Sequence, residues 1–176
     1  MTKIIDLQSY RTIVLEKRIF GPWQKRFGET YGLKTRLSDL SGKVLYYLAQ
    51  PGEASSLAYY ELIMGVLDFG TASDFHYLSN EKKMAVVDIH LFLADQVRFE
   101  MMWRLKWVKV FEARKFGLME LVQNFKHIKT TCRKNPPELA ESNPDYLAYT
   151  KLTYGDKEVF IRRMLQKALE AFTEKI

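Results

Sequence analysis

Histidine and carboxylate side chains occur in two short pairs that suggest metal binding. Asp74 precedes His76 by two residues, and Asp88 precedes His90 by the same step. On a helix, residues two apart point about 200° away from each other, so Asp88 and His90 cannot share one ion. His76 lies in an expected loop, but one loose pair supplies too few ligands for a stable site. The sequence therefore predicts no metal site and no bound cofactor.

Cys132 is the single cysteine and the candidate nucleophile. Arg133 and Lys134 follow it, and neighbouring positive charge lowers the pKa of a thiol. His127 lies five residues earlier, a step that directs it away from Cys132 on a helix. The sequence contains no nucleophile elbow, phosphate-binding glycine loop or dinucleotide fingerprint. We therefore predict no catalytic residue and favour a protein that is not an enzyme.

Two aspartates share a face of the expected helix that contains them. Asp88 and Asp95 are seven residues apart, with Phe92 and Phe99 beside them. Burial among aromatic rings would raise a carboxyl pKa. Arg98, three residues after Asp95, provides an ordinary ion-pair partner, so a structural role is favoured.

Lys and Arg side chains concentrate in residues 98–134. This segment has ten basic and three acidic residues, a net charge of +7, whereas the remainder carries −1 of the total of +6. Aromatic residues alternate with the basic ones, as on many nucleic-acid-binding surfaces. The basic residues are nevertheless dispersed around the helix, which is more typical of a solvated rim. The candidate surface for an anionic partner consists of Arg98, Lys106, Lys109, Lys126, Lys129 and Arg133.

An aromatic series at four-residue steps is the strongest local pattern. Phe99, Trp103, Trp107 and Phe111 would form one ridge along a helix. Large aromatic side chains on a helix are usually buried against a neighbouring helix. We therefore expect Trp103 and Trp107 to be largely buried and to serve packing.

The elements that position these residues are predicted to be helices. Residues 80–116 contain no proline or glycine, so they are expected to form one long helix, or a helix with a break that the sequence does not announce. Apolar residues also recur with helical spacing in residues 37–48, 54–69, 118–128 and 156–172. Residues 7–20 fit a helix or a strand, and we favour the helix, ending at Gly21-Pro22. The prediction is an all-α fold, a single-domain helical bundle spanning residues 1–176 around the central helix 80–116.

The composition gives the remaining expectations. The chain has 47% hydrophobic residues, 27% charged residues and one cysteine, which is typical of a folded domain in a reducing compartment. No uninterrupted apolar run of about 18 residues occurs, so no membrane segment is expected. We predict a cytoplasmic protein.

Three functions remain open. The favoured one is a helical interaction or adaptor protein that binds a protein partner or associates with itself. The first alternative is an accessory or regulatory protein that binds an anionic partner, such as nucleic acid, through residues 98–134. The second alternative is a helical bundle that binds a small ligand in a pocket lined by Tyr46, Tyr47, Tyr59, Tyr60 and the tryptophans.

Overall fold

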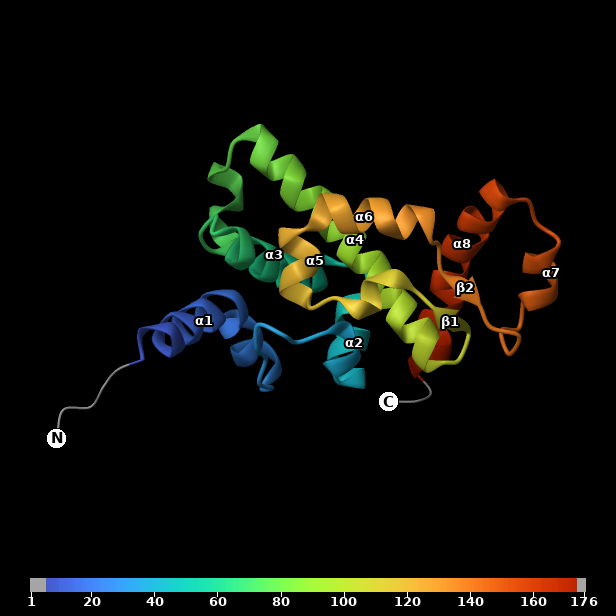
Figure 1. Ribbon diagram of the computed structural model, residues 1–176, viewed down its shortest axis with the longest axis horizontal. Coiled ribbons are helices and arrows are strands. Elements are labelled where there is room, and N and C mark those ends of the chain that lie inside the picture. The colour runs from blue at the N-terminus through green and yellow to red at the C-terminus, as the bar shows by residue number, and fades with distance from the viewer. Residues whose placement is uncertain (1–5, 174–176) are drawn as a thin grey trace.

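The computed structural model describes residues 6–173, apart from the side chains of Tyr154 and Glu158, and these residues form an assembly of helices (Figure 1). The α-helices are α1 (Leu7–Phe27), α2 (Gly42–Ala49), α3 (Glu53–Leu67), α4 (Asn80–Arg104), α5 (Leu118–Gln123), α6 (Phe125–Lys134), α7 (Tyr146–Thr150) and α8 (Tyr154–Thr173). The short 3-10 helices are η1 (Leu37–Asp39), η2 (Ala72–Tyr77) and η3 (Glu112–Lys115). Strands β1 (Val108–Val110) and β2 (Glu138–Leu139) form a small antiparallel pair. The predicted all-α fold is confirmed.

Helix α4 lies at the centre of the fold and contacts α2, α3 and α8 (Figure 1). It begins where the Ser79 hydroxyl accepts a hydrogen bond from the Lys82 backbone N–H, the usual way to satisfy a free amide at a helix start. Val86, Ile89, Leu93 and Val97 are buried along its length. The expected central helix is therefore present, with its predicted start.

The predicted end of this helix at residue 116 is wrong, because α4 ends at Arg104. Lys106 adopts a left-handed backbone with φ 64°. The Lys106 N–H then bonds to the Trp103 carbonyl at 2.9 Å and the Trp107 N–H bonds to the Met102 carbonyl at 2.8 Å. These two bonds form a Schellman motif, which normally has glycine at the left-handed position. A lysine there gives no sequence signal for the end of a helix.

The predicted break at Gly21-Pro22 is also wrong, because α1 continues through Pro22 to Phe27. The helix preference for residues 7–20 is confirmed. Proline leaves the carbonyl four residues earlier, that of Arg18, without its helical partner. This carbonyl lies where α1 crosses Gly65 of α3, and a Cβ added at Gly65 would come within 2.8 Å of it. Close packing against α3 therefore maintains a helix that its sequence weakens.

Two other predicted helices are divided. Residues 37–48 form η1 and then α2, because Leu40 is extended and Ser41 caps the new helix through the Val44 N–H. Residues 118–128 form α5 and α6, separated at Asn124. The predicted helix 54–69 corresponds to α3, which ends at Asp68 in the left-handed region. The chain changes direction where one short helix ends and the next begins, so α5 and α6 reach different parts of the fold (Figure 1).

Buried apolar side chains form one cluster that extends from α1 to α8. Its largest fully buried members include Trp23, whose indole N–H donates to the Ala58 carbonyl at 2.7 Å, and Tyr59, whose hydroxyl donates to the Leu48 carbonyl at 2.8 Å. Within residues 6–173, no helix is both long enough and apolar enough to cross a membrane.

Candidate functional site

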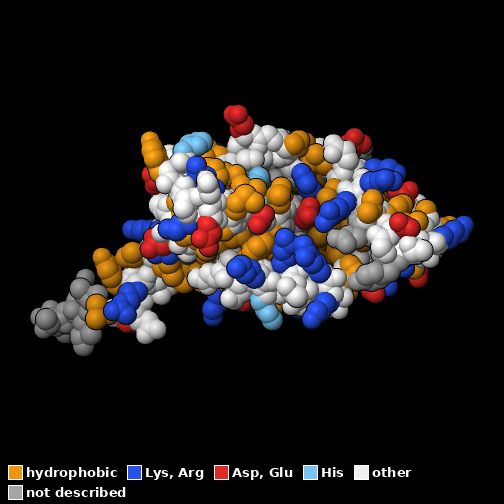
Figure 2. All heavy atoms as spheres, turned by 90° about the horizontal axis from the view of Figure 1, so that it is seen from above, with side chains coloured by type: hydrophobic (Ala, Val, Ile, Leu, Met, Phe, Trp, Pro, Cys, Tyr) orange, Lys and Arg blue, Asp and Glu red, His pale blue; other side chains and the backbone are white. Residues whose placement is uncertain are grey.

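A groove of about 1110 Å³ lies over α4. Residues of α4 form its floor. The walls come from the turn between α2 and α3, from α6 with the Pro136-Pro137 turn that follows it, and from α8. Figure 2 views this face from above, where Lys, Arg and acidic side chains surround apolar ones. Its volume lies just above the range of about 300–1,000 Å³ that is typical of small-molecule sites.

The helical repeat of α4 places two kinds of side chain in this groove. Phe92, Gln96 and Phe99 follow one ridge, at steps of four and three residues. Asp88 and Asp95 follow an adjacent ridge, on the same face of α4, as their seven-residue spacing predicted. An apolar line and a charged line therefore run side by side along the floor.

Aromatic rings from other elements complete the apolar part of the groove. The Phe99 ring lies 6.1 Å from the Phe111 ring, and the Phe92 ring lies 5.5 Å from that of Phe125. Phe92, Phe99 and Phe111 are each at least nine-tenths buried. Phe111 reaches the groove because the chain turns back after α4, so it contacts Phe99 without belonging to the same helix.

The predicted aromatic ridge is thus only partly correct. Phe99 and Trp103 lie on α4, whereas Trp107 and Phe111 follow the Schellman turn. Trp103 and Trp107 are half-buried rather than largely buried. The Arg114 guanidinium stacks on the Trp103 ring, 3.4 Å from its centroid, and covers part of the exposed face.

Three of the six predicted anion-binding residues come together at the groove. Arg98 of α4 and Lys129 and Arg133 of α6 all line it. The other three lie outside its lining: Lys106 and Lys109 are exposed near β1, where Lys109 pairs with Glu138 at 3.8 Å, and Lys126 is exposed on α6. Three cations that were not predicted also line the groove, namely Lys134, Lys157 and Arg162.

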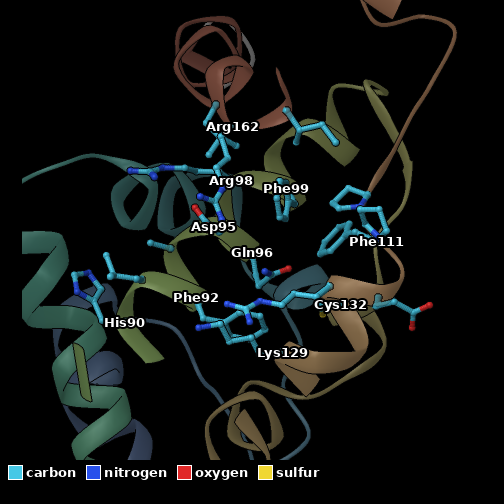
Figure 3. A pocket seen from close by; sticks show the side chains of 18 of the residues that line it. His90, Phe92, Asp95, Gln96, Arg98, Phe99, Phe111, Lys129, Cys132 and Arg162 are labelled. Carbon is cyan, nitrogen blue, oxygen red and sulfur yellow. The ribbon is translucent and has the colours of Figure 1, made fainter. Parts of the chain in front are cut away.

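The cations exceed the carboxylates around the groove. Six Lys and Arg side chains line it, against the carboxylates of Asp88, Asp95, Glu112 and Glu138. A smaller hollow of about 320 Å³ adjoins it between the end of α2 and α8. Arg98 and Arg162 line both spaces, and Arg163 lines the smaller one. Arg98 and Arg162 therefore lie where these two spaces meet, and Figure 3 shows them with Asp95 beside Arg98.

His90 lines the groove without forming a metal site. Its ring packs against Tyr59 and Tyr60, with centroids 5.0 Å and 5.4 Å away. Burial, and secondarily the positive charge of Arg98, lower the pKa of His90, which favours the neutral ring. Among the described residues, no group of three His, Cys, Asp or Glu side chains is arranged to hold a metal ion.

Cys132 also lines the groove, but its surroundings oppose nucleophilic chemistry. Burial and the negative charge of Glu112 raise the pKa of the thiol to about 11. The lowering effect expected from Arg133 and Lys134 is therefore wrong. The thiolate is the reactive form of cysteine, so this environment disfavours Cys132 as a nucleophile near neutral pH.

The tyrosine-lined pocket expected from the sequence differs from the observed groove. Of Tyr46, Tyr47, Tyr59 and Tyr60, Tyr59 is the one that lines it. Tyr149 also lines it, with the Lys157 ammonium 5.0 Å from its ring. Burial raises the pKa of both Tyr59 and Tyr149, so both hydroxyls are protonated at neutral pH.

Two polar residues escaped the sequence analysis. Glu100 is completely buried and is held by Arg104 at 3.2 Å and Arg114 at 2.9 Å. Gln96 is 5% exposed and projects into the groove (Figure 3). Helical spacing was the available signal: Gln96 follows the buried Leu93 by three residues and Glu100 follows the buried Val97 by three, so both lie on the buried face of α4, where a polar residue requires a partner.

The groove thus combines aromatic rings, cations and one buried carboxamide. No protein-family model, curated protein or solved structure matches this chain, so the groove is interpreted from its own side chains.

Proposed function

We propose that the protein binds a small organic anion with an apolar part, and that the groove over α4 is its binding site. One observation carries the proposal: cations from three separate helices converge on a groove floored by phenylalanines. Arg98, Lys129 and Arg162 belong to α4, α6 and α8, yet all border the same space. Pockets of this kind bind through apolar contact and use a few polar groups for orientation.

The same observation combines two of the functions considered from the sequence. Part of the basic segment contributes its cations, as the anionic-partner hypothesis requires. The enclosed apolar floor supplies the contact area that the ligand-binding hypothesis requires. A fully exposed basic surface would not have Phe92, Phe99 and Phe111 beneath the cations, so a ligand with both characters fits the site best.

The test uses 8-anilinonaphthalene-1-sulfonate, an aromatic anion whose fluorescence rises in an apolar site. We expect one saturable site per chain at neutral pH, with affinity that decreases as salt screens the cations. Replacing Lys129→Met should weaken binding about tenfold, the loss of a charged contact.

Lys126→Met is the matched control, because Lys126 lies on the same helix but outside the groove lining. Its affinity should stay within about twofold of the original protein. Equal affinities for the two variants, or the absence of saturable binding, would contradict the proposal. Circular dichroism of each variant establishes that the fold is retained.

A second candidate function is self-association, favoured by an exposed apolar face on α1. Leu7, Tyr10, Ile13 and Val14 are each about half or more exposed in the first two turns of this helix. The buried side chains Ile19, Phe20 and Trp23 belong to its later turns. Two copies of such a stripe would cover each other across a twofold axis. Sedimentation equilibrium tests this: a monomer at high concentration, or a dimer unchanged by Val14→Glu, would refute it.

A further inference from the structure

Gln96 differs from the other buried polar side chains of the described chain. Ser55 donates to the Gln50 carbonyl at 2.6 Å, Glu100 is bound by two arginines, and Asn143 accepts from the Asp145 N–H at 2.9 Å. The Gln96 carboxamide makes no hydrogen bond to any residue that the structure describes. Leaving a buried amide without a partner is unfavourable, so its position requires an explanation.

The carboxamide is directed at the open space of the groove. Within the described residues, no side-chain nitrogen or oxygen that is sealed from solvent lacks a partner. The amide atoms of Gln96 must therefore reach the groove, and Figure 3 shows them there between Phe92 and Phe99. A carboxamide presents one donor and one acceptor side by side. It matches a ligand edge that offers the complementary pair.

The rings beside Gln96 specify the shape of that ligand group. Phe92 precedes Gln96 by four residues and Phe99 follows it by three, so both flank the amide along α4. Phe111 adds a third ring beside Phe99. These rings are at least nine-tenths buried, so a flat aromatic ligand group meets their exposed edges. Nucleobases are flat and carry adjacent donors and acceptors on their edges that a glutamine can bind with two hydrogen bonds.

Arg98 lies on the opposite flank of α4 from Gln96, and Arg162 and Arg163 of α8 lie near it. Gln96 and Arg98 are two residues apart, which separates them by about 200° around α4. Arg98 borders the smaller hollow together with Arg162 and Arg163. Arg guanidinium groups bind phosphate through paired hydrogen bonds. Asp95, on the ridge between Gln96 and Arg98, presents a carboxylate toward the groove, where a sugar hydroxyl could donate to it.

From this order of groups we infer that the ligand is a nucleoside phosphate lying across α4, with its base at Gln96 and its phosphate at Arg98, Arg162 and Arg163. The inference rests on the proposed function, because it specifies the anion that the groove binds. Two ligands present such a nucleotide unit: a free mononucleotide and a single-stranded oligonucleotide.

The experiment titrates the full chain with AMP, GMP, CMP and UMP by isothermal calorimetry, with ribose 5-phosphate as the ligand without a base. At least one nucleotide should bind more tightly than ribose 5-phosphate. Replacing Gln96→Leu should weaken that nucleotide about tenfold or more, because two base hydrogen bonds are lost, and should leave ribose 5-phosphate unchanged. Arg98→Met should weaken both ligands. Gln123→Leu, an exposed glutamine outside the groove, is the matched control and should change neither.

Titrating the same variants with a labelled single-stranded oligonucleotide of ten nucleotides distinguishes the two sources of the nucleotide. Binding of the strand that depends on Gln96, without binding of mononucleotides, supports the inference with a strand as the ligand. Strand binding that is equal in the original protein and in Gln96→Leu overturns it, because only phosphates are then recognised. Gln96→Glu, which removes the donor, provides the same comparison if Gln96→Leu does not fold.

The outcome also distinguishes this inference from the proposed function. If the anilinonaphthalene anion binds in a Lys129-dependent way and no nucleotide or strand competes with it, the nucleotide assignment is overturned while the proposed function stands. If neither ligand class binds, both are overturned.

Discussion

The buried carboxylate of Glu100 should be a major determinant of stability, and its replacement Glu100→Gln tests this directly. The Glu100 side chain is 0% exposed, and its two oxygens accept from Arg104 at 3.2 Å and from Arg114 at 2.9 Å. Arg104 also donates to the Leu37 and Leu40 carbonyls, at 3.1 Å and 2.7 Å. The carboxylate thereby connects the end of α4 to η1 and η3. Glutamine keeps the size but places an N–H₂ donor against guanidinium donors.

The expected loss of folding free energy follows from how exposed the two partner arginines are. Removing one member of a buried ion pair costs about 3–5 kcal/mol of folding free energy. Arg104 and Arg114 are 22% and 28% exposed, so both can regain some hydration and the lower end applies. We expect Glu100→Gln to destabilise the protein by about 3 kcal/mol. For a chain of this length, that corresponds to a decrease in Tm of about 6–12 °C.

Urea and thermal denaturation followed by far-ultraviolet circular dichroism measure both quantities. Glu138→Gln is the control, because Glu138 pairs with Lys109 at 3.8 Å with both side chains more than half exposed. Exposed pairs contribute about 0–1 kcal/mol. A loss below about 1 kcal/mol for Glu100→Gln would refute the reasoning. Glu100 does not line the groove, so the folded variant should keep its affinity for the anilinonaphthalene anion.

Three further predictions concern a helix crossing and two titratable groups. Gly65→Ala should destabilise the protein by about 1–3 kcal/mol in urea denaturation, because the added Cβ would lie 2.8 Å from the Arg18 carbonyl oxygen. Gly21→Ala is the control and should not destabilise the protein, because a Cβ at Gly21 would meet nothing within 4 Å. The pKa of Cys132 is raised to about 11 in the folded chain. Its reaction with iodoacetamide at pH 8 should therefore be on the order of a hundredfold slower in the folded than in the urea-unfolded chain. Similar rates in the two states would contradict its burial. The pKa of His90 is lowered from 6.5, so the unfolded state binds its proton more readily and stability should decrease as the pH falls below about 6.5. The decrease should be smaller in His90→Gln, measured by urea denaturation at pH 7.5 and pH 5.5, and an equal decrease would exclude His90 as its source.

The helical character of the chain could be predicted because it depends on local periodicity, but several helix ends could not. Helical spacing of apolar residues is repeated along most of the sequence, and capping serines such as Ser41 and Ser79 stand where helices begin. The end of α4 depends on a left-handed Lys106, a residue type that rarely signals a helix end. The continuity of α1 through Pro22 depends on its contact with Gly65, which lies far away in the sequence. Tertiary packing decided both cases.

The candidate site was harder to predict, because its cations had to be sorted by face. The sequence places ten basic residues within 98–134, and they serve different purposes in the fold. Arg104 and Arg114 neutralise Glu100, while Lys109 and Lys115 pair with surface carboxylates. Arg98, Lys129, Arg133 and Lys134 line the groove. Helical spacing across 80–116 cannot separate these groups, because residues after Arg104 do not belong to α4.

The net charge of residues 98–134 therefore overstates how many of their cations are available for the proposed anion site. The available cations are identified by their position beside the aromatic rings of the groove. Gln96 illustrates the same principle for a neutral residue. Helical spacing places Gln96 on the buried face of α4, but its surroundings become apparent only once Phe111, which follows β1, and Lys129 of α6 are brought near it. Among the buried polar residues of the described chain, Gln96 is the one whose amide faces the open groove instead of a partner within the fold. A ligand that binds in the groove over α4, as we propose, would supply Gln96 with hydrogen bonds that no other residue of the described chain provides.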